Sequence, residues 1–307
     1  MRASVVVPAR NRLSLLARTL ETLVDQDLSP ADYEIIVCDD GSTQDIAAVL
    51  ARFAAAPVVI RLNRQPPHGP AAARNLGIRL SAAPIVIFVD SDVEADKALV
   101  RCLLSAFAAH EEWAGAEAAL YPLGEPAGVL WDAPASLGGG RYHTAGIAYR
   151  RAVLLAVGGF DEEFTLPACE DVELAVRVLA RGPIGFVPDA KVWHPRRRVT
   201  AGTHWRWRHH WRYQTILAVR YGILAFPDRP CGPFPRLRVA WAAVASLPGG
   251  RLWSALKASP DAPCEACLGS LLALFDIVCG LWMLPSILFA AVPVRRDNMV
   301  HRRSGQA

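Results

Sequence analysis

Apolar runs with the length of β-strands alternate with helical patterns in the first third of the chain, and this alternation constrains the fold most strongly. Runs rich in Val and Ile occupy positions 3–7, 33–38, 58–62 and 85–89. Segments with apolar residues at helical spacing separate and follow them, at 13–24, 45–53, 71–80 and 95–109. Strands that alternate with helices predict an α/β fold whose mainly parallel sheet is covered by helices on both faces.

Polar or conformationally special residues follow three of these strands. They are the segments Pro8–Arg12, Asp39–Ser42 and Asp90–Asp92. Ligands of open α/β sheets bind beyond the carboxyl ends of the strands. We therefore expect the three segments to converge on one crevice.

The carboxylates in two of these segments each allow two interpretations. Asp90 and Asp92, with Ser91 between them, have the oxygen ligands that Mg²⁺ or Mn²⁺ accepts, but Asp also favours turns and helix N-caps. An acidic residue at Asp39 or Asp40 can accept hydrogen bonds from a nucleotide base or ribose, and the same residues are equally typical of a turn.

Several short motifs, taken together and in order, are more specific than any one of them. The chain resembles the inverting nucleotide-sugar glycosyltransferases of family two, which have the GT-A fold, from Ala3 to about Pro195. The resemblance lies in Val5-Val6-Val7-Pro8 with Asn11, Glu34 to Ser42, Gly69 to Gly77, Asp90-Ser91-Asp92, Gly158 to Glu162 and Glu170 to Leu174. It implies a catalytic domain over residues 1–198.

The resemblance also implies which residues bind the nucleotide. Pro8 and Ala9 would line the nucleotide pocket, Asp40 would contact the base, and Asp39 would shape the turn. Arg74 would lie near the base or the diphosphate, to which a guanidinium donates two parallel hydrogen bonds. Without the resemblance, Arg74 would be interpreted as an exposed charge on a helix.

A divalent cation, Mn²⁺ or Mg²⁺, is the cofactor that the resemblance implies. Asp92 would ligate it, Asp90 would contact either the metal or the ribose, and the cation would bridge the donor diphosphate. His194 follows a strand and precedes Pro195. In related enzymes a histidine at this place reaches the metal or the diphosphate, and the alternative is a surface histidine.

Glu170 and Asp171 open a segment with helical periodicity. Acids are favourable in a first helical turn, so the pair has a purely structural explanation. By resemblance, Asp171 is the catalytic base that removes the acceptor's proton, and Glu170 supports it. Two adjacent acids can also raise the pKa of one of them. A Gly- and Pro-rich stretch at 125–141 has the composition of an active-site flap.

Residues 199–307 are expected to form a helical, partly membrane-associated extension. Tryptophans and arginines alternate in a helical pattern at 204–221, which suits a membrane interface better than a nucleic acid. An apolar stretch at 268–292 is long enough to span a bilayer but contains Asp276 and Pro285. We expect a re-entrant or interfacial hairpin there, and a helix packed on the enzyme or between subunits is the alternative.

The cysteines and the amino terminus indicate a reducing compartment. The chain has seven scattered cysteines, an odd number, and no apolar segment of signal-peptide length near its start. Cys264 and Cys267 form a single C-x-x-C without the second half of a zinc site. We therefore expect the protein in the cytoplasm, at the cytoplasmic face of the membrane.

These observations together predict a metal-dependent glycosyltransferase. The expected donor is a nucleotide sugar, with UDP-sugar as the class that the resemblance favours. The expected acceptor is a glycan, a lipid-linked glycan or a small molecule, and no nucleic-acid partner is expected. The alternative is a non-catalytic nucleotide-sugar-binding subunit of a glycan-assembly complex.

Overall fold

The computed structural model describes residues 1–125, 131–198, 201–224 and 226–230, and these divide into two compact units. The first unit consists of residues 1–122 and 134–195. The second contains the described residues of the ranges 123–133 and 196–230. The sequence analysis placed the domain boundary at 198, so the short segments 123–133 and 196–198 group differently.

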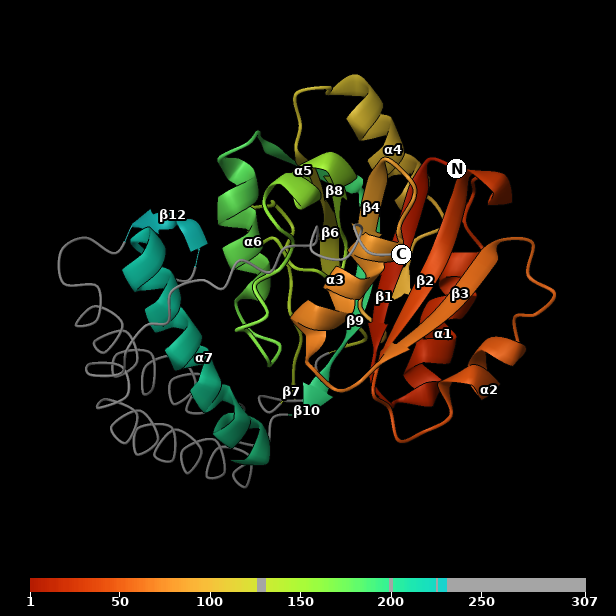
Figure 1. Ribbon diagram of the computed structural model, residues 1–307, viewed down its shortest axis with the longest axis horizontal. Coiled ribbons are helices and arrows are strands. Elements are labelled where there is room, and N and C mark those ends of the chain that lie inside the picture. Colours follow the sequence, from red (N-terminus) through yellow and green to blue (C-terminus); the bar gives the residue numbers. More distant parts are fainter. Residues whose placement is uncertain (126–130, 199–200, 225, 231–307) are drawn as a thin grey trace, which may run out of the picture. The chain divides into compact units, whose positions relative to one another are not determined.

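The predicted parallel strands form one half of an eight-stranded sheet in the first unit. Three pairings are parallel, joining β3 (Val59–Gln65), β2 (Tyr33–Asp40), β1 (Ala3–Ala9) and β4 (Ile85–Phe88) in that spatial order (Figure 1). In register, Ala9 at the end of β1 lies beside Asp39 of β2. Parallel strands align their carboxyl ends, so the segments after β1, β2 and β4 emerge along one edge, as predicted.

Alternate residues of these strands enter two separate apolar cores. Val5, Val7 and Ile35 pack with α1 (Leu13–Val24), α2 (Ile46–Ala51) and α4 (Leu99–Ala109). Val6 and Ile36 pack on the opposite face with α3 (Pro70–Leu80), α5 (Arg151–Ala156) and α6 (Glu170–Leu179). A strand buried on both faces needs apolar residues at every position, which explains the continuous runs in the sequence.

The other half of the sheet contains three antiparallel pairings. Beyond β4 the order continues with β8 (Ile147–Arg150), β6 (Gly115–Leu123), β9 (Ile184–Pro195) and β5 (Glu94–Ala95). β9 is a single strand of 12 residues. β5 occupies the predicted start of the helix at 95–109, because Glu94 and Ala95 pair with Trp193 and Val192 and the helix then begins at Leu99.

The second unit contains the predicted helix at 204–221, observed as α7 (Ala201–Tyr221). Two small antiparallel pairs accompany it: β7 (Trp131–Asp132) with β10 (Arg197–Arg198), and β11 (Ile223–Leu224) with β12 (Phe226–Pro230). Among the helices in the described ranges, none has the length and apolarity needed to cross a membrane. The apolar stretch 268–292 and the pair Cys264 and Cys267 lie outside the described residues.

Candidate active site

Asp39 and Asp40 end β2 and are both buried. Asp39 Oδ1 accepts a hydrogen bond of 2.8 Å from the backbone N–H of Ser42, so it closes the turn as predicted. Asp40 accepts three hydrogen bonds, from Gln65 Nε2 at 2.9 Å and from the backbone N–H groups of His68 and Gly69 at 2.8 and 2.9 Å. A carboxylate has about four acceptor positions, so Asp40 retains capacity for one more donor.

Gly69 brings the loop after β3 against the segment that precedes α6. Its φ of +96° is in the left-handed half of conformational space, and a Cβ there would lie 2.3 Å from the carbonyl oxygen of Thr165. Only glycine tolerates both the backbone angle and the close approach. The Asp40-anchored loop and the acidic start of α6 are therefore held next to each other by backbone contact.

Asn11 and Arg12 connect the segment after β1 to its neighbours. Both have left-handed backbone angles, with φ of 57°. Asn11 Oδ1 accepts hydrogen bonds from Thr43 and Gln44, which follow β2. The Arg12 guanidinium extends to Asp92 after β4, with 3.1 Å between Nη1 and Oδ2. The ends of β1, β2 and β4 are thus linked by side-chain contacts.

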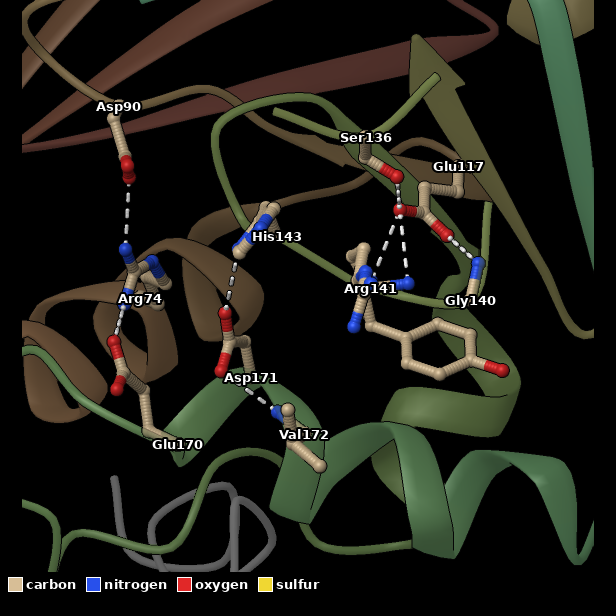
Figure 2. A network of polar contacts seen from close by, with 11 residues as sticks. Arg74, Asp90, Glu117, Ser136, Gly140, Arg141, His143, Glu170, Asp171 and Val172 are labelled. Atoms are coloured by element: carbon tan, nitrogen blue, oxygen red, sulfur yellow. Dashed lines mark hydrogen bonds and ion pairs between the residues drawn. The ribbon is translucent and has the colours of Figure 1, made fainter. Parts of the chain in front are cut away.

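Arg74 is buried and joins two of the predicted carboxylates. Its Nη2 donates to Asp90 Oδ1 at 2.8 Å, and its Nη1 donates to Glu170 Oε1 at 2.9 Å (Figure 2). The side chain is only 4% exposed, so the interpretation of Arg74 as an exposed helix charge is wrong. Arg74 connects the carboxyl end of β4 to the first turn of α6.

Asp92 and His194 approach each other at the same edge. His194 Nε2 lies 3.6 Å from Asp92 Oδ1, and both side chains are about 95% buried. His194 Nδ1 lies 2.9 Å from the carbonyl oxygen of Pro195, which can only accept, so Nδ1 carries a proton. When the imidazole is neutral and Nδ1 carries the proton, Nε2 is unprotonated and its lone pair points toward the carboxylate of Asp92. The alternative of a surface histidine is wrong.

This pair fits a divalent cation, because an imidazole nitrogen and a carboxylate oxygen that face each other are both electron-pair donors. Asp90 lies two positions away, but its Oδ1 is bound by Arg74. Within the described residues, no three or more His, Cys, Asp or Glu side chains form a group that could hold a metal by themselves. A cation at Asp92 and His194 would need further ligands from a substrate or from water.

Glu170 begins α6 and has an unusual environment. Burial raises the pKa of its carboxyl to about 7, and the charge of Asp171 acts in the same direction while Arg74 opposes it. Its Oε1 is bound by Arg74, whereas its Oε2 is buried without a hydrogen-bond partner. A protonated Oε2 avoids the cost of an unpaired buried charge.

Asp171 lies beside Glu170 but faces a different partner. Its Oδ1 accepts from the backbone N–H of Val172, and its Oδ2 lies 3.6 Å from Nδ1 of His143 (Figure 2). Burial favours the neutral imidazole, but the contact with Asp171 and the charges of Asp171, Glu117 and Asp90 outweigh it and raise the pKa of His143. His143 and Asp171 therefore form an ion pair below that pKa.

His143 is held by a loop that a buried glutamate organises. Glu117 on β6 accepts hydrogen bonds from the hydroxyl of Ser136 at 2.7 Å and from three backbone N–H groups, those of Gly140, Arg141 and Tyr142 (Figure 2). Four donors to one buried carboxylate fix the loop 136–142 just before His143. All of this loop except Tyr142 lies within the stretch 125–141, which the sequence suggested as a flap.

The contacts connect half of the predicted site residues into two chains. Asp90, Arg74 and Glu170 form one chain, and Arg12, Asp92 and His194 form the other. Pro8 and Ala9 occupy the end of β1 beside Cys38 and Asp39. The sequence analysis missed His143 and Glu117, because neither belongs to a motif and their partners are remote in sequence.

Comparison with known proteins identifies relatives of the first unit. The sequence profile of the family described as Glycosyl transferase family 2 matches residues 4–116. A validoxylamine A glucosyltransferase from Streptomyces hygroscopicus subsp. limoneus is 33% identical over 58% of this chain and 48% of the relative. This chain therefore spans about half the length of that protein.

Two solved structures have the same fold. S. aureus TarS residues 1–349, in complex with UDP-GlcNAc, has a TM-score of 0.58 and 18% identity, covering 94% of this chain and 84% of that one. A mannosyltransferase from Pyrobaculum calidifontis, in complex with GDP-Man and Mn²⁺, has a TM-score of 0.61 and 18% identity, covering 92% of this chain and 86% of that one. The GT-A architecture predicted from the sequence is thereby confirmed.

Proposed function

We propose that this chain moves a sugar from a nucleoside-diphosphate sugar to an acceptor hydroxyl with inversion at the anomeric carbon, and the match of residues 4–116 to the profile of glycosyl transferase family 2 supports this proposal. The observation that carries this proposal is the Arg74 bridge. It ties Asp90, on the proposed donor side, to Glu170, on the proposed acceptor side, at 2.8 and 2.9 Å. In one active site, the residues that bind the donor and those that activate the acceptor must lie within a few ångströms of each other.

The donor is bound in this proposal by the segments after β1 and β2. Asp40 uses its remaining acceptor position to bind an N–H group of the nucleotide base. Pro8 and Ala9, at the adjacent end of β1, line the nucleotide pocket. We propose a UDP-sugar. The likeness to TarS with UDP-GlcNAc supports this choice, while the likeness to a mannosyltransferase with GDP-Man makes GDP-mannose the first competitor to test.

Asp92 and His194 are the proposed protein ligands of Mn²⁺ or Mg²⁺, with Asp90 beside them. Such ions retain positions for substrate phosphates, which suits a site with few protein ligands. A cation bound there supplies positive charge that stabilises the departing nucleoside diphosphate. The Mn²⁺ in the similar mannosyltransferase supports this assignment.

Asp171 is the proposed base. It removes the proton of the acceptor hydroxyl, the oxygen attacks the anomeric carbon, and the bond from that carbon to the diphosphate breaks on the opposite face. Glu170 supports Asp171 in this proposal, because its own carboxyl is buried and its Oε1 is bound by Arg74. The two neighbouring acids thus have separate tasks.

The acceptor and the location of the enzyme are proposals from the sequence. We propose a glycan, lipid-linked or small-molecule acceptor at the cytoplasmic face of a membrane. The support is the mean hydropathy of +0.22 and the apolar stretch at 268–292, which is followed by Arg295 and Arg296. Sedimentation of the full chain with anionic vesicles tests the membrane contact.

The experiment for the proposed function has two parts. A thermal-shift screen of nucleotide sugars with and without Mn²⁺ identifies the donor, since a ligand that binds the folded state raises the melting temperature. The enzyme is then assayed for transfer or donor hydrolysis, together with Asp171→Asn and with the exposed control Glu111→Gln. Donor binding without turnover in the wild type would favour the non-catalytic binding subunit.

A further inference from the structure

His143 is the one charged partner that approaches Asp171 from outside its own helix among the described contacts. The imidazole comes from the loop between β7 and β8, and the carboxylate comes from the first turn of α6 (Figure 2). Both side chains are partly accessible, with 30% and 16% of their surfaces exposed. The pair is therefore open to a ligand, unlike the buried bridge between Arg74 and Glu170.

We propose that His143 is a positioning residue that holds the carboxylate of Asp171 in the orientation from which it takes the acceptor's proton. This inference rests on the proposed function of the same site. Val172 N–H already binds Oδ1, so a second contact at Oδ2 fixes the remaining rotation of the carboxylate. Both oxygens are then oriented before an acceptor arrives.

The distance of 3.6 Å is that of an ion pair and is longer than a hydrogen bond. Catalytic contacts are often long without substrate and shorten when the reacting complex forms. The structure contains a reason for the pair to be preformed, because Glu117 fixes the preceding loop through four donors. An acceptor would therefore bind next to an Asp171 carboxylate whose orientation His143 already fixes.

The pair has a predictable dependence on pH. The charged groups that act on His143 are Asp171 on α6, Glu117 on β6 and Asp90 after β4, and all three favour the imidazolium. Imidazolium carries a proton on Nδ1 under all conditions, whereas neutral imidazole does so in only one tautomer. The interaction between His143 and the carboxylate of Asp171 therefore weakens as the pH rises through the pKa of His143.

Two substitutions of His143 distinguish the effect of its N–H donor from the effect of its positive charge. His143→Asn retains an N–H donor near the position of Nδ1 but cannot titrate, whereas His143→Ala removes the donor. We expect kcat to fall on the order of tenfold to a hundredfold in His143→Ala, with the donor KM unchanged, because misplacement of a reacting group slows the chemical step. We expect His143→Asn to recover most of kcat and to lose the decline of kcat at higher pH.

His110→Ala is the matched control, because His110 forms a similar pair with Glu112 at 3.3 Å in which both side chains are well exposed. It should leave kcat and its pH profile unchanged. An activity of His143→Ala equal to that of the wild type at every pH would overturn the inference. So would a loss confined to the acceptor KM, which would identify His143 as a binding residue instead.

A measurement without turnover covers the case in which the variants fold poorly. The imidazole resonance of His143, identified by its absence in His143→Asn, is titrated in the wild type and in Asp171→Asn. The pKa of His143 should fall in Asp171→Asn, and an unchanged value would overturn the inference. Transfer by the wild type that fails only this test leaves the proposed function intact, whereas an inactive wild type would refute both.

Discussion

Arg74 and Glu170 are joined by an ion pair of 2.9 Å although 96 positions separate them in the sequence. Both side chains are about 95% buried, so neither charge has compensation from bulk water. Removing one member of a buried pair leaves the other without a partner and is far more costly than loss of a surface pair. This contact joins the two halves of the candidate site.

Arg74→Met should lower the free energy of unfolding by roughly 3–5 kcal/mol, because Asp90 and Glu170 both lose their cation. Urea denaturation measures this loss. Arg79→Met on the same helix is the control, since Arg79 is exposed and a surface substitution changes stability by less than about 0.5 kcal/mol. Equal effects of the two substitutions would contradict the buried bridge.

The stability of the wild type should depend on Glu170 between pH 4.5 and 7. Its folded-state pKa is raised from 4.5 to about 7, so the folded protein holds a proton that the unfolded chain has released. The free energy of unfolding of the wild type should therefore fall relative to Glu170→Gln by about 3 kcal/mol as the pH rises through this range, and the difference should be constant above it. Glu111→Gln should give a curve parallel to the wild type.

Mn²⁺ should raise the melting temperature of the wild type in the presence of a nucleoside diphosphate, and this effect should be lost in Asp92→Asn and His194→Gln. A ligand at 100 times its Kd adds about 2.7 kcal/mol to the stability of the folded state. Asp25→Asn is the control, because Asp25 forms an exposed pair with Lys97. A retained Mn²⁺ response in both site variants would place the metal elsewhere.

Gly77→Ala should destabilise the protein by about 1–3 kcal/mol through overpacking. A Cβ at Gly77 would lie 2.2 Å from Cγ1 of Val6, where α3 packs against β1. Gly138→Ala meets nothing within 4 Å and should be close to neutral. Thermal unfolding of the two variants in parallel compares a packed contact with an open one.

The parallel half of the sheet was predictable because its signals are local. Buried parallel strands such as β2 are apolar at every position, and the carboxylates Asp39, Asp40, Asp90 and Asp92 follow the strands directly. The position of Asp171 in a first helical turn was also evident from the sequence. These features depend on neighbours in the chain, which a sequence displays.

The remaining parts depend on partners that are remote in sequence. β5 is only Glu94 and Ala95, and it exists because it pairs with β9. In the sequence, Arg74 resembles an exposed residue of a helix. Its guanidinium can be buried because Asp90 and Glu170, which are remote in sequence, pair with it. His143 stands in a loop without any pattern around it, and its significance comes from α6. Tertiary contacts override local preference at such places.

β4 is parallel to β1 on one side and antiparallel to β8 on the other. Within this sheet the strands up to β4 form the parallel half, and the later strands β5, β6, β8 and β9 form the other half. The chain thus completes one half before it builds the other. A substitution or insertion in one of the later strands therefore leaves the three parallel pairings of β1 to β4 unchanged.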